Sequence, residues 1–160
     1  MSCDMLVKLY NVKDDPALEA ALKQDGVSLK RAMPPDLQRV AGFAREHFSD
    51  GWANEAHVAV VRNHCWIAVR DKKIVGFSCY DSTMLNFFGP IGVLESERGK
   101  GIGKALLLKC MISMKEMGYA YAIIGWVGPE EFYAKTVGAV CIPDSIPNSY
   151  ENMVNVVNAI

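Results

Sequence analysis

VLESERGKGIGKALL, residues 93–107, is the stretch of sequence that decides how this chain folds. Its alternate glycines, Gly99, Gly101 and Gly103, let backbone N–H groups turn toward one point, and the helix predicted to follow adds the positive end of its dipole. Positive charge at the same end comes from Arg98, Lys100 and Lys104. The pattern predicts a cradle for an anion, with phosphate as the best match, and an ordinary tight turn is the alternative.

Other motifs of similar composition do not fit. A Walker A loop requires Ser or Thr after its Gly-Lys pair, but Gly103-Lys104 is followed by Ala105. A dinucleotide fingerprint, GxGxxG, would need its third glycine where Lys104 or Leu106 stands. GFSCY, residues 76–80, lacks the last glycine of a nucleophile elbow. There is no HExxH motif and the three histidines form no cluster, so no metal site is predicted.

The glycine loop stands between a predicted strand and a predicted helix. Residues 87–94 precede it, residues 102–117 have apolar positions at helical spacing, and residues 119–127 are almost all apolar, as in a strand covered on both faces. Gly89, Pro90 and Gly92 would distort a regular strand, as at a bulge or a close backbone approach. The order strand, helix, strand favours a mixed α/β sheet. Further strands are predicted at residues 5–10, 27–32, 65–69, 74–80, near 140 and at 153–157, and further helices at 17–23, 34–48, 52–61 and 130–136.

Composition narrows the class of protein. A chain of 160 residues with 51% apolar and 22% charged residues fits one globular domain. Seventeen basic against 18 acidic residues give a net charge of -1, which favours neither nucleic acid nor an anionic membrane as a partner. The first ten residues lack the pattern of a signal peptide, so a cytoplasmic protein is predicted. The five cysteines have no CxxC spacing and are expected to be reduced, buried and apolar.

Two motifs together carry a resemblance to a known family. Arg98, Gly101 and Gly103 meet the pattern [Q/R]-x-x-G-x-[G/A], and EFYAKTVGA, residues 131–139, is similar to an FYxKxGF signature. In this order and at this separation they resemble the GNAT superfamily of acyl-CoA-dependent N-acyltransferases, over roughly residues 65–140. Gly138-Ala139 stands where the family has Gly-Phe, and residues 88–93 are richer in Gly and Pro than the family's fourth strand.

The resemblance implies a fold. It is a mixed, mostly antiparallel, twisted α/β sheet of six or seven strands, flanked by helices and splayed between its fourth and fifth strands. Residues 1–160 would form one such domain, in which residues 1–25 are a strand-helix extension.

The resemblance also implies acetyl-CoA as co-substrate, without a metal. Its pantetheine arm would enter the splay and pair with the fourth strand, and its pyrophosphate would lie on the glycine loop. The residues that match these positions are Ile91, Gly92, Val93, Arg98, Gly99, Lys100, Gly101, Ile102, Gly103 and Lys104. Homodimers are common in the family.

Direct attack of an amine on a thioester needs three groups. A base or a water chain must take a proton from the amine, and Glu95 and Glu55 are the candidates, with Asp81 a weaker one. An N–H group, such as that of Val93, must stabilise the oxyanion. Tyr133 matches the family tyrosine that protonates the departing thiolate, although it could also be a packing residue. Candidates for apolar walls around the acceptor are Trp52, Trp126 and Tyr150.

We therefore expect an N-acetyltransferase that acts on the primary amine of a small molecule, such as an amino sugar, an amino acid or an aminoglycoside-like compound. The alternatives are a non-catalytic acyl-CoA-binding regulatory module, a protein N-terminal or lysine acetyltransferase, and a nucleotide-phosphate binder of another fold.

Overall fold

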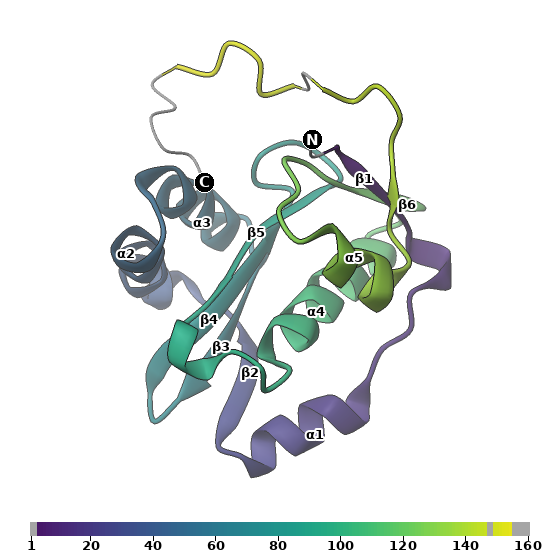
Figure 1. Ribbon diagram of the computed structural model, residues 1–160. Coiled ribbons are helices and arrows are strands. Elements are labelled where there is room, and N and C mark those ends of the chain that lie inside the picture. The colour runs from purple at the N-terminus through teal and green to yellow at the C-terminus, as the bar shows by residue number, and fades with distance from the viewer. Residues whose placement is uncertain (1–2, 147–148, 155–160) are drawn as a thin grey trace.

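The computed structural model describes residues 3–146 and 149–154 and has a seven-stranded mixed sheet at its centre (Figure 1). The strand order is β2-β3-β4-β5-β6-β1-β7, and every neighbouring pair is antiparallel except β5 and β6. This confirms the predicted mixed, mostly antiparallel sheet. The strands are β1 (Met5–Lys8), β2 (Val27–Arg31), β3 (Cys65–Arg70), β4 (Lys73–Tyr80), β5 (Phe87–Val93), β6 (Tyr121–Ile124) and β7 (Val140–Cys141).

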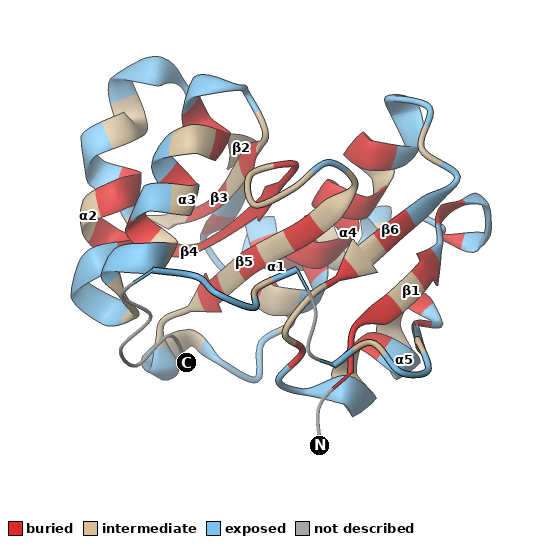
Figure 2. Cartoon of the chain, turned by 90° about the horizontal axis from the view of Figure 1, so that it is seen from above, coloured by how far each residue is buried: buried red, intermediate tan, exposed pale blue. Residues whose placement is uncertain are grey.

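Helices cover both faces of the sheet and turn their buried sides toward it (Figures 1 and 2). One face carries α2 (Leu37–His47) and α3 (Asp50–Val61); the other carries α1 (Pro16–Gln24), α4 (Ile102–Glu116) and α5 (Glu130–Val137). Three short 3-10 helices are Leu9–Asn11, Pro34–Asp36 and Glu95–Glu97. Apolar side chains from α2 and α3 pack on β3 and β4, and those of α4 pack against β3, β4, β1 and β6.

Local sequence signals set the ends of these elements. The Asp15 side chain accepts a hydrogen bond from the Leu18 N–H (3.1 Å) at the start of α1, and Ser49 caps α3 in the same way. Asp71 and Lys72 adopt positive φ, as a two-residue hairpin turn between β3 and β4 requires. Gly138 ends α5 at a φ of 66°.

The sheet splays between β5 and β6. Only Phe87 and Phe88 of β5 pair with β6, through Ile123 and Ile124, while β5 continues to Val93. Counted from β2, these are the fourth and fifth strands, so the splay lies where it was expected. The register of β5 on β4 shifts by one residue between Ile91 and Phe88, which confirms the irregularity predicted from Gly89 and Pro90.

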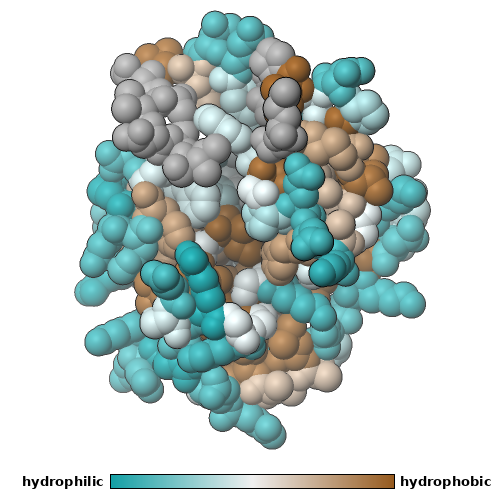
Figure 3. All heavy atoms as spheres, viewed as in Figure 1, coloured by the Kyte–Doolittle hydropathy of each residue, from teal (hydrophilic) through white to brown (hydrophobic). Residues whose placement is uncertain are grey.

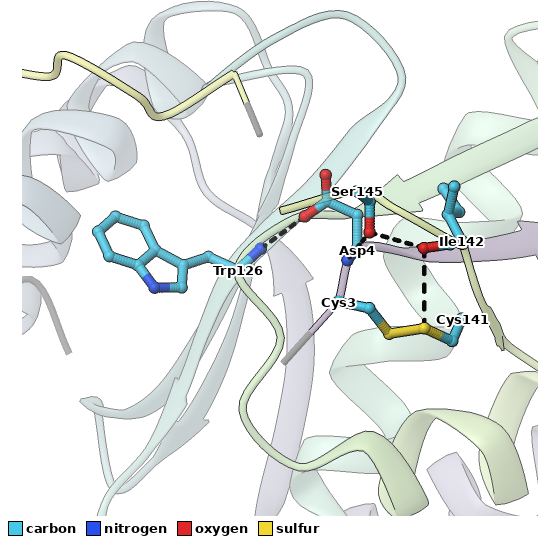
Figure 4. The surroundings of a disulfide bond; sticks show 6 residues. All are labelled: Cys3, Asp4, Trp126, Cys141, Ile142 and Ser145. Atoms are coloured by element: carbon cyan, nitrogen blue, oxygen red, sulfur yellow. Dashed lines mark hydrogen bonds between the residues drawn. A yellow bond between two sulfur atoms is a disulfide. The ribbon is translucent and has the colours of Figure 1, made fainter. Parts of the chain in front are cut away.

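The N-terminal strand lies inside the sheet, because β1 pairs with β6 on one side and with β7 on the other. Just before it, Cys3 forms a disulfide with Cys141 of β7, with 5.9 Å between their Cα atoms (Figure 4). The expectation of five reduced cysteines is therefore wrong for this pair. The two cysteines are 138 positions apart in sequence and gave no spacing signal, and only the pairing of β1 with β7 brings them together.

The strand predicted at residues 153–157 lies partly outside the described residues. Its described part, residues 153–154, is not in a strand. The described part of the C-terminal segment, from residue 142, runs across the molecule from the β7 side toward α3 (Figures 1 and 2).

The disulfide yields a first prediction. Thiol titration of the unfolded, unreduced chain should find three free thiols, those of Cys65, Cys79 and Cys110. Because the cross-link restricts the unfolded chain, Cys141→Ser should lower the free energy of unfolding by about 2–4 kcal/mol in urea denaturation. As a control, the double variant with Cys3→Ser should lose no more than the single variant. Five titratable thiols in the wild-type chain would contradict the bond.

Candidate functional site

The splay opens into a groove with a cavity of about 1290 Å³. Figure 3 shows a hollow near the centre of this face, with hydrophobic residues in it and hydrophilic residues around it. The groove is lined by β5, by the loop at the start of α4, by the segment from β6 to α5 and by residues of α3. The C-terminal segment of the chain also lines the groove, through Tyr150, Met153 and Val154.

One edge of β5 faces this groove. The N–H of Leu94 donates to the carbonyl of Val75 in β4 (2.9 Å). Because backbone groups of successive strand residues point to opposite sides, those of Val93 and Ile91 point away from β4 and into the splay. The Val93 carbonyl accepts a hydrogen bond from Arg98 Nε (3.3 Å). The N–H groups of Ile91 and Val93 are therefore placed to meet a ligand that lies along the strand.

The glycine loop forms the cradle that its sequence predicts. Gly99 and Gly101 have φ values of 79° and 90°, which only glycine adopts at little cost, and α4 begins directly after them. The first N–H groups of α4 have no carbonyl of their own helix to bind. At Gly103 an added Cβ would meet only Val93 Cγ2 (3.9 Å) and Phe132 Cζ (4.0 Å), so the backbone lies open to the groove.

Carboxylates neutralise two of the three basic side chains around the cradle. Lys104 Nζ lies 3.3 Å from Asp15 Oδ2, and Lys100 Nζ lies 2.9 Å from Glu97 Oε2. Lys100 does not line the groove, whereas Arg98 and Lys104 do. Backbone amides and the dipole of α4 therefore provide most of the attraction for an anion.

Tyr133 of α5 lines the middle of the groove and is 5% exposed. Its ring lies edge-on to Phe88 of β5, at 6.2 Å between centroids, and contacts Phe132. Burial raises the pKa of Tyr133 to about 12. A tyrosine is protonated near neutral pH at its ordinary pKa as well, so the phenol of Tyr133 carries a proton that it can donate.

Glu55 lies at the opposite end of the groove from the cradle. It is on the same side of α3 as Trp52, one turn earlier, and both line the groove. Thr83, in the loop before β5, donates a hydrogen bond to Glu55 Oε1. Burial raises the pKa of Glu55, and the Thr83 bond opposes this shift only in part. A buried carboxylate with a raised pKa is suited to accept a proton near neutral pH.

Two aromatic residues complete this end. Burial raises the pKa of Tyr150 to about 12, and its ring centroid lies 5.1 Å from that of Trp126. The N–H of Trp126 donates to Asp4 Oδ1 (3.1 Å), so the start of the chain holds this residue (Figure 4). The three aromatic residues proposed as walls, Trp52, Trp126 and Tyr150, all line the groove.

Not every predicted residue lies in the groove. Glu95 is exposed in the 3-10 helix after β5 and does not line it. Asp81 is 2% exposed, and its carboxylate accepts hydrogen bonds from the Asn86 N–H (2.7 Å) and the Tyr119 hydroxyl (2.9 Å), so its role is structural. Sequence reasoning missed Thr83, because nothing near it in sequence marks it as a partner of Glu55.

No group of three or more His, Cys, Asp or Glu side chains among the described residues could hold a metal ion. Within the same residues, each helix is too short or too polar to cross a bilayer.

Residues 61–136 match the model of the acetyltransferase (GNAT) domain. The match contains both the glycine loop and Tyr133, and it confirms the resemblance predicted from the sequence. A comparison with curated proteins found no match.

Solved structures share the fold at low sequence identity. The GCN5-related glucosamine N-acetyltransferase region of a fungal multi-domain GH3 beta-N-acetylglucosaminidase has a TM-score of 0.71 at 17% identity, over 88% of this chain and 19% of that chain. A GCN5-related N-acetyltransferase from Sphaerobacter thermophilus has a TM-score of 0.66 at 17% identity, over 88% of this chain and 48% of that one. A GNAT family acetyltransferase from Brucella melitensis, in complex with acetyl-CoA, has a TM-score of 0.55 at 14% identity, over 76% of this chain and 92% of that chain. The chain thus spans less than half the length of the first two.

The burial of Glu55 yields a prediction about stability. Because its pKa is raised above the usual value of 4.5, the folded state binds more protons than the unfolded state just above that pH. The contribution of Glu55 to the free energy of unfolding therefore falls as the pH rises through its folded pKa. Glu55→Gln removes this contribution and keeps an acceptor for Thr83, so its stability relative to the wild type should increase from pH 5 to pH 7.5, as measured by urea denaturation.

A matched control is Glu116→Gln, at the exposed end of α4. Its stability relative to the wild type should be the same at both pH values. A Glu55→Gln variant that is equally destabilised at pH 5 and pH 7.5 would contradict the assignment of a raised pKa.

Proposed function

We propose that this chain, whose residues 61–136 match the GNAT acetyltransferase domain, transfers the acetyl group of acetyl-CoA to the primary amine of a small molecule. One observation carries the proposal. A single groove runs along the free edge of β5 and joins the glycine cradle at one end to Tyr133 and Glu55 further along. An anion site, a proton donor and a proton acceptor thus line one cavity.

The residues present fit acetyl-CoA. The cradle of Gly99, Gly101 and Gly103 suits its pyrophosphate, and the N–H groups of Ile91 and Val93 suit the amides of its pantetheine arm. Acetyl-CoA supplies an acyl group that is activated as a thioester. A cavity of about 1290 Å³ leaves room beside it for an acceptor.

Each protein group has one task in the reaction that we propose. Glu55 accepts a proton from the acceptor ammonium, so that a neutral amine can attack. The N–H of Val93 donates a hydrogen bond to the acyl oxygen as it gains negative charge. Tyr133, which is protonated near neutral pH, donates its proton to the departing thiolate.

The alternatives differ in what they need from Tyr133. A non-catalytic acyl-CoA-binding module needs only the cradle, whereas a transferase needs the phenol as well. A protein N-terminal or lysine acetyltransferase would use the same chemistry on a larger acceptor. The single domain over residues 1–160, the cytoplasmic location and the homodimer stay predictions.

The first test concerns the cradle. In calorimetric titration, acetyl-CoA should bind in the micromolar range, at about -8 kcal/mol, and more tightly than ATP. Gly103→Asp places a carboxylate in the cradle while favouring the start of α4, so it should weaken binding by about tenfold or more with little change in stability. The matched control is Gly42→Asp in α2, where an added Cβ meets nothing within 4 Å, and it should bind normally. Failure of the wild-type protein to bind acetyl-CoA would refute the proposal.

The second test concerns Tyr133. Tyr133→Phe removes the proton donor and keeps the ring that packs on Phe88, so acetyl-CoA should bind with unchanged affinity. Turnover, followed as thiol release with a panel of amines, should fall by about 100-fold or more. Unchanged turnover in Tyr133→Phe would exclude the phenol as the acid.

A further inference from the structure

The two ends of the groove are far apart. β5 has seven residues, so it spans about 20 Å from its start to its end. Thr83, which binds Glu55, precedes β5, whereas Arg98 and Lys104 follow it. We call the end around Glu55, Thr83, Trp126 and Tyr150 the acceptor end.

The charges of the lining residues are divided between these ends. Among the described residues that line the groove, the only cations are Arg98 and Lys104, both at the cradle. Of the other acidic lining residues, Glu97 is paired with Arg70, and Asp50 is 84% exposed and paired with Arg45. Glu55 is therefore the half-buried carboxylate of the acceptor end, with no lysine or arginine beside it in the described lining.

The C-terminal segment, as far as residue 160, has no basic side chain that could lie at this end. Residues 136–160 contain no Lys or Arg. What its described part brings to the groove is Tyr150, Met153 and Val154, one phenol and two apolar side chains. Trp126 faces Tyr150 and is fixed through its N–H by Asp4. Apart from Asn54 and Thr83, the described walls around Glu55 are aromatic and apolar, and the backbone of Trp126 is held in place by Asp4, just before the N-terminal strand.

We propose that the acceptor end takes a primary amine carried on an uncharged, apolar body, of the arylalkylamine class, and rejects the corresponding amino acids. This inference rests on the proposed function. Glu55 would bind the ammonium group, and the rings of Trp126 and Tyr150 would cover the aromatic or alkyl body. An amino acid would bring its carboxylate near Glu55 into a site whose described lining offers it no cation, which costs both desolvation and like-charge repulsion.

The proposed reaction is balanced. An ammonium acceptor and acetyl-CoA give an N-alkyl acetamide, CoA thiol and one proton. The C–S bond of the thioester breaks and a C–N bond forms. Glu55 takes the first proton from the ammonium group and passes it to solvent, while the thiolate gains a proton from Tyr133. The phenolate is reprotonated by the second proton that the nitrogen loses.

The test measures acceptor binding without turnover. Tryptamine and tryptophan, phenylethylamine and phenylalanine, and glucosamine are titrated calorimetrically into the protein saturated with CoA. Each amine should bind at least about tenfold more tightly than its amino acid, and more tightly than glucosamine. Glu55→Gln removes the repulsion, so it should bring the affinity ratio of each pair toward one. Glu116→Gln, outside the groove, should leave the ratio unchanged.

Each other outcome overturns this inference. Equal or tighter binding of the amino acids would mean that a cation reaches the acceptor end. Tighter binding of glucosamine would mean that the body is a polar sugar. Failure of all five compounds to bind while CoA binds would refute the acceptor class and leave the acyl-CoA site standing. Failure of acetyl-CoA itself to bind would instead refute the proposed function.

Discussion

The separation of β5 from β6 is the constraint on which the rest of this structure depends. Beyond Phe88, β5 loses its parallel neighbour, and the backbone groups of Ile91 and Val93 turn into a groove. Unpaired backbone groups are costly in a dry interior, so such an edge is tolerated only where water or a ligand can reach it. Helix α4 compensates for the missing hydrogen bonds, since its apolar side chains pack against strands on both sides of the splay. The same helix presents its N-terminus to the groove, so one element holds the sheet together and provides the cradle.

The groups that we propose for proton transfer are held where their charged forms are disfavoured. Burial raises the pKa of Glu55, and it raises the pKa values of Tyr133 and Tyr150 to about 12. Sites chosen for stability alone would bury apolar side chains at these positions. A carboxylate that binds protons more readily and a phenol that keeps its proton are, however, the pair that an amine and a thiolate require.

Much of the fold and one end of the site could be predicted from the sequence, because the signals are contiguous. The glycine cradle and Tyr133 belong to short motifs, and the bulge in β5 follows from Gly89 and Pro90. The partner of Glu55 could not be predicted, since Thr83 is 28 residues away in a loop without a motif. The disulfide between Cys3 and Cys141 could not be predicted for the same reason, because only the insertion of β1 beside β7 brings the two cysteines together. Glu95 was a candidate by its position after β5, but the 3-10 helix turns it to the surface.

The cradle could be predicted from the sequence and the acceptor end could not, and this difference has a physical origin. The cradle is made by consecutive residues whose conformation is fixed by glycine and by the start of α4. The acceptor end is assembled from α3, the loop before β5, the segment after β6 and the C-terminal segment, and Asp4 at the start of β1 fixes Trp126 from a fifth place in the chain. Substitutions near either terminus can therefore reshape the acceptor end while the cradle stays intact. A fold built in this way can keep one acyl donor and change its acceptor.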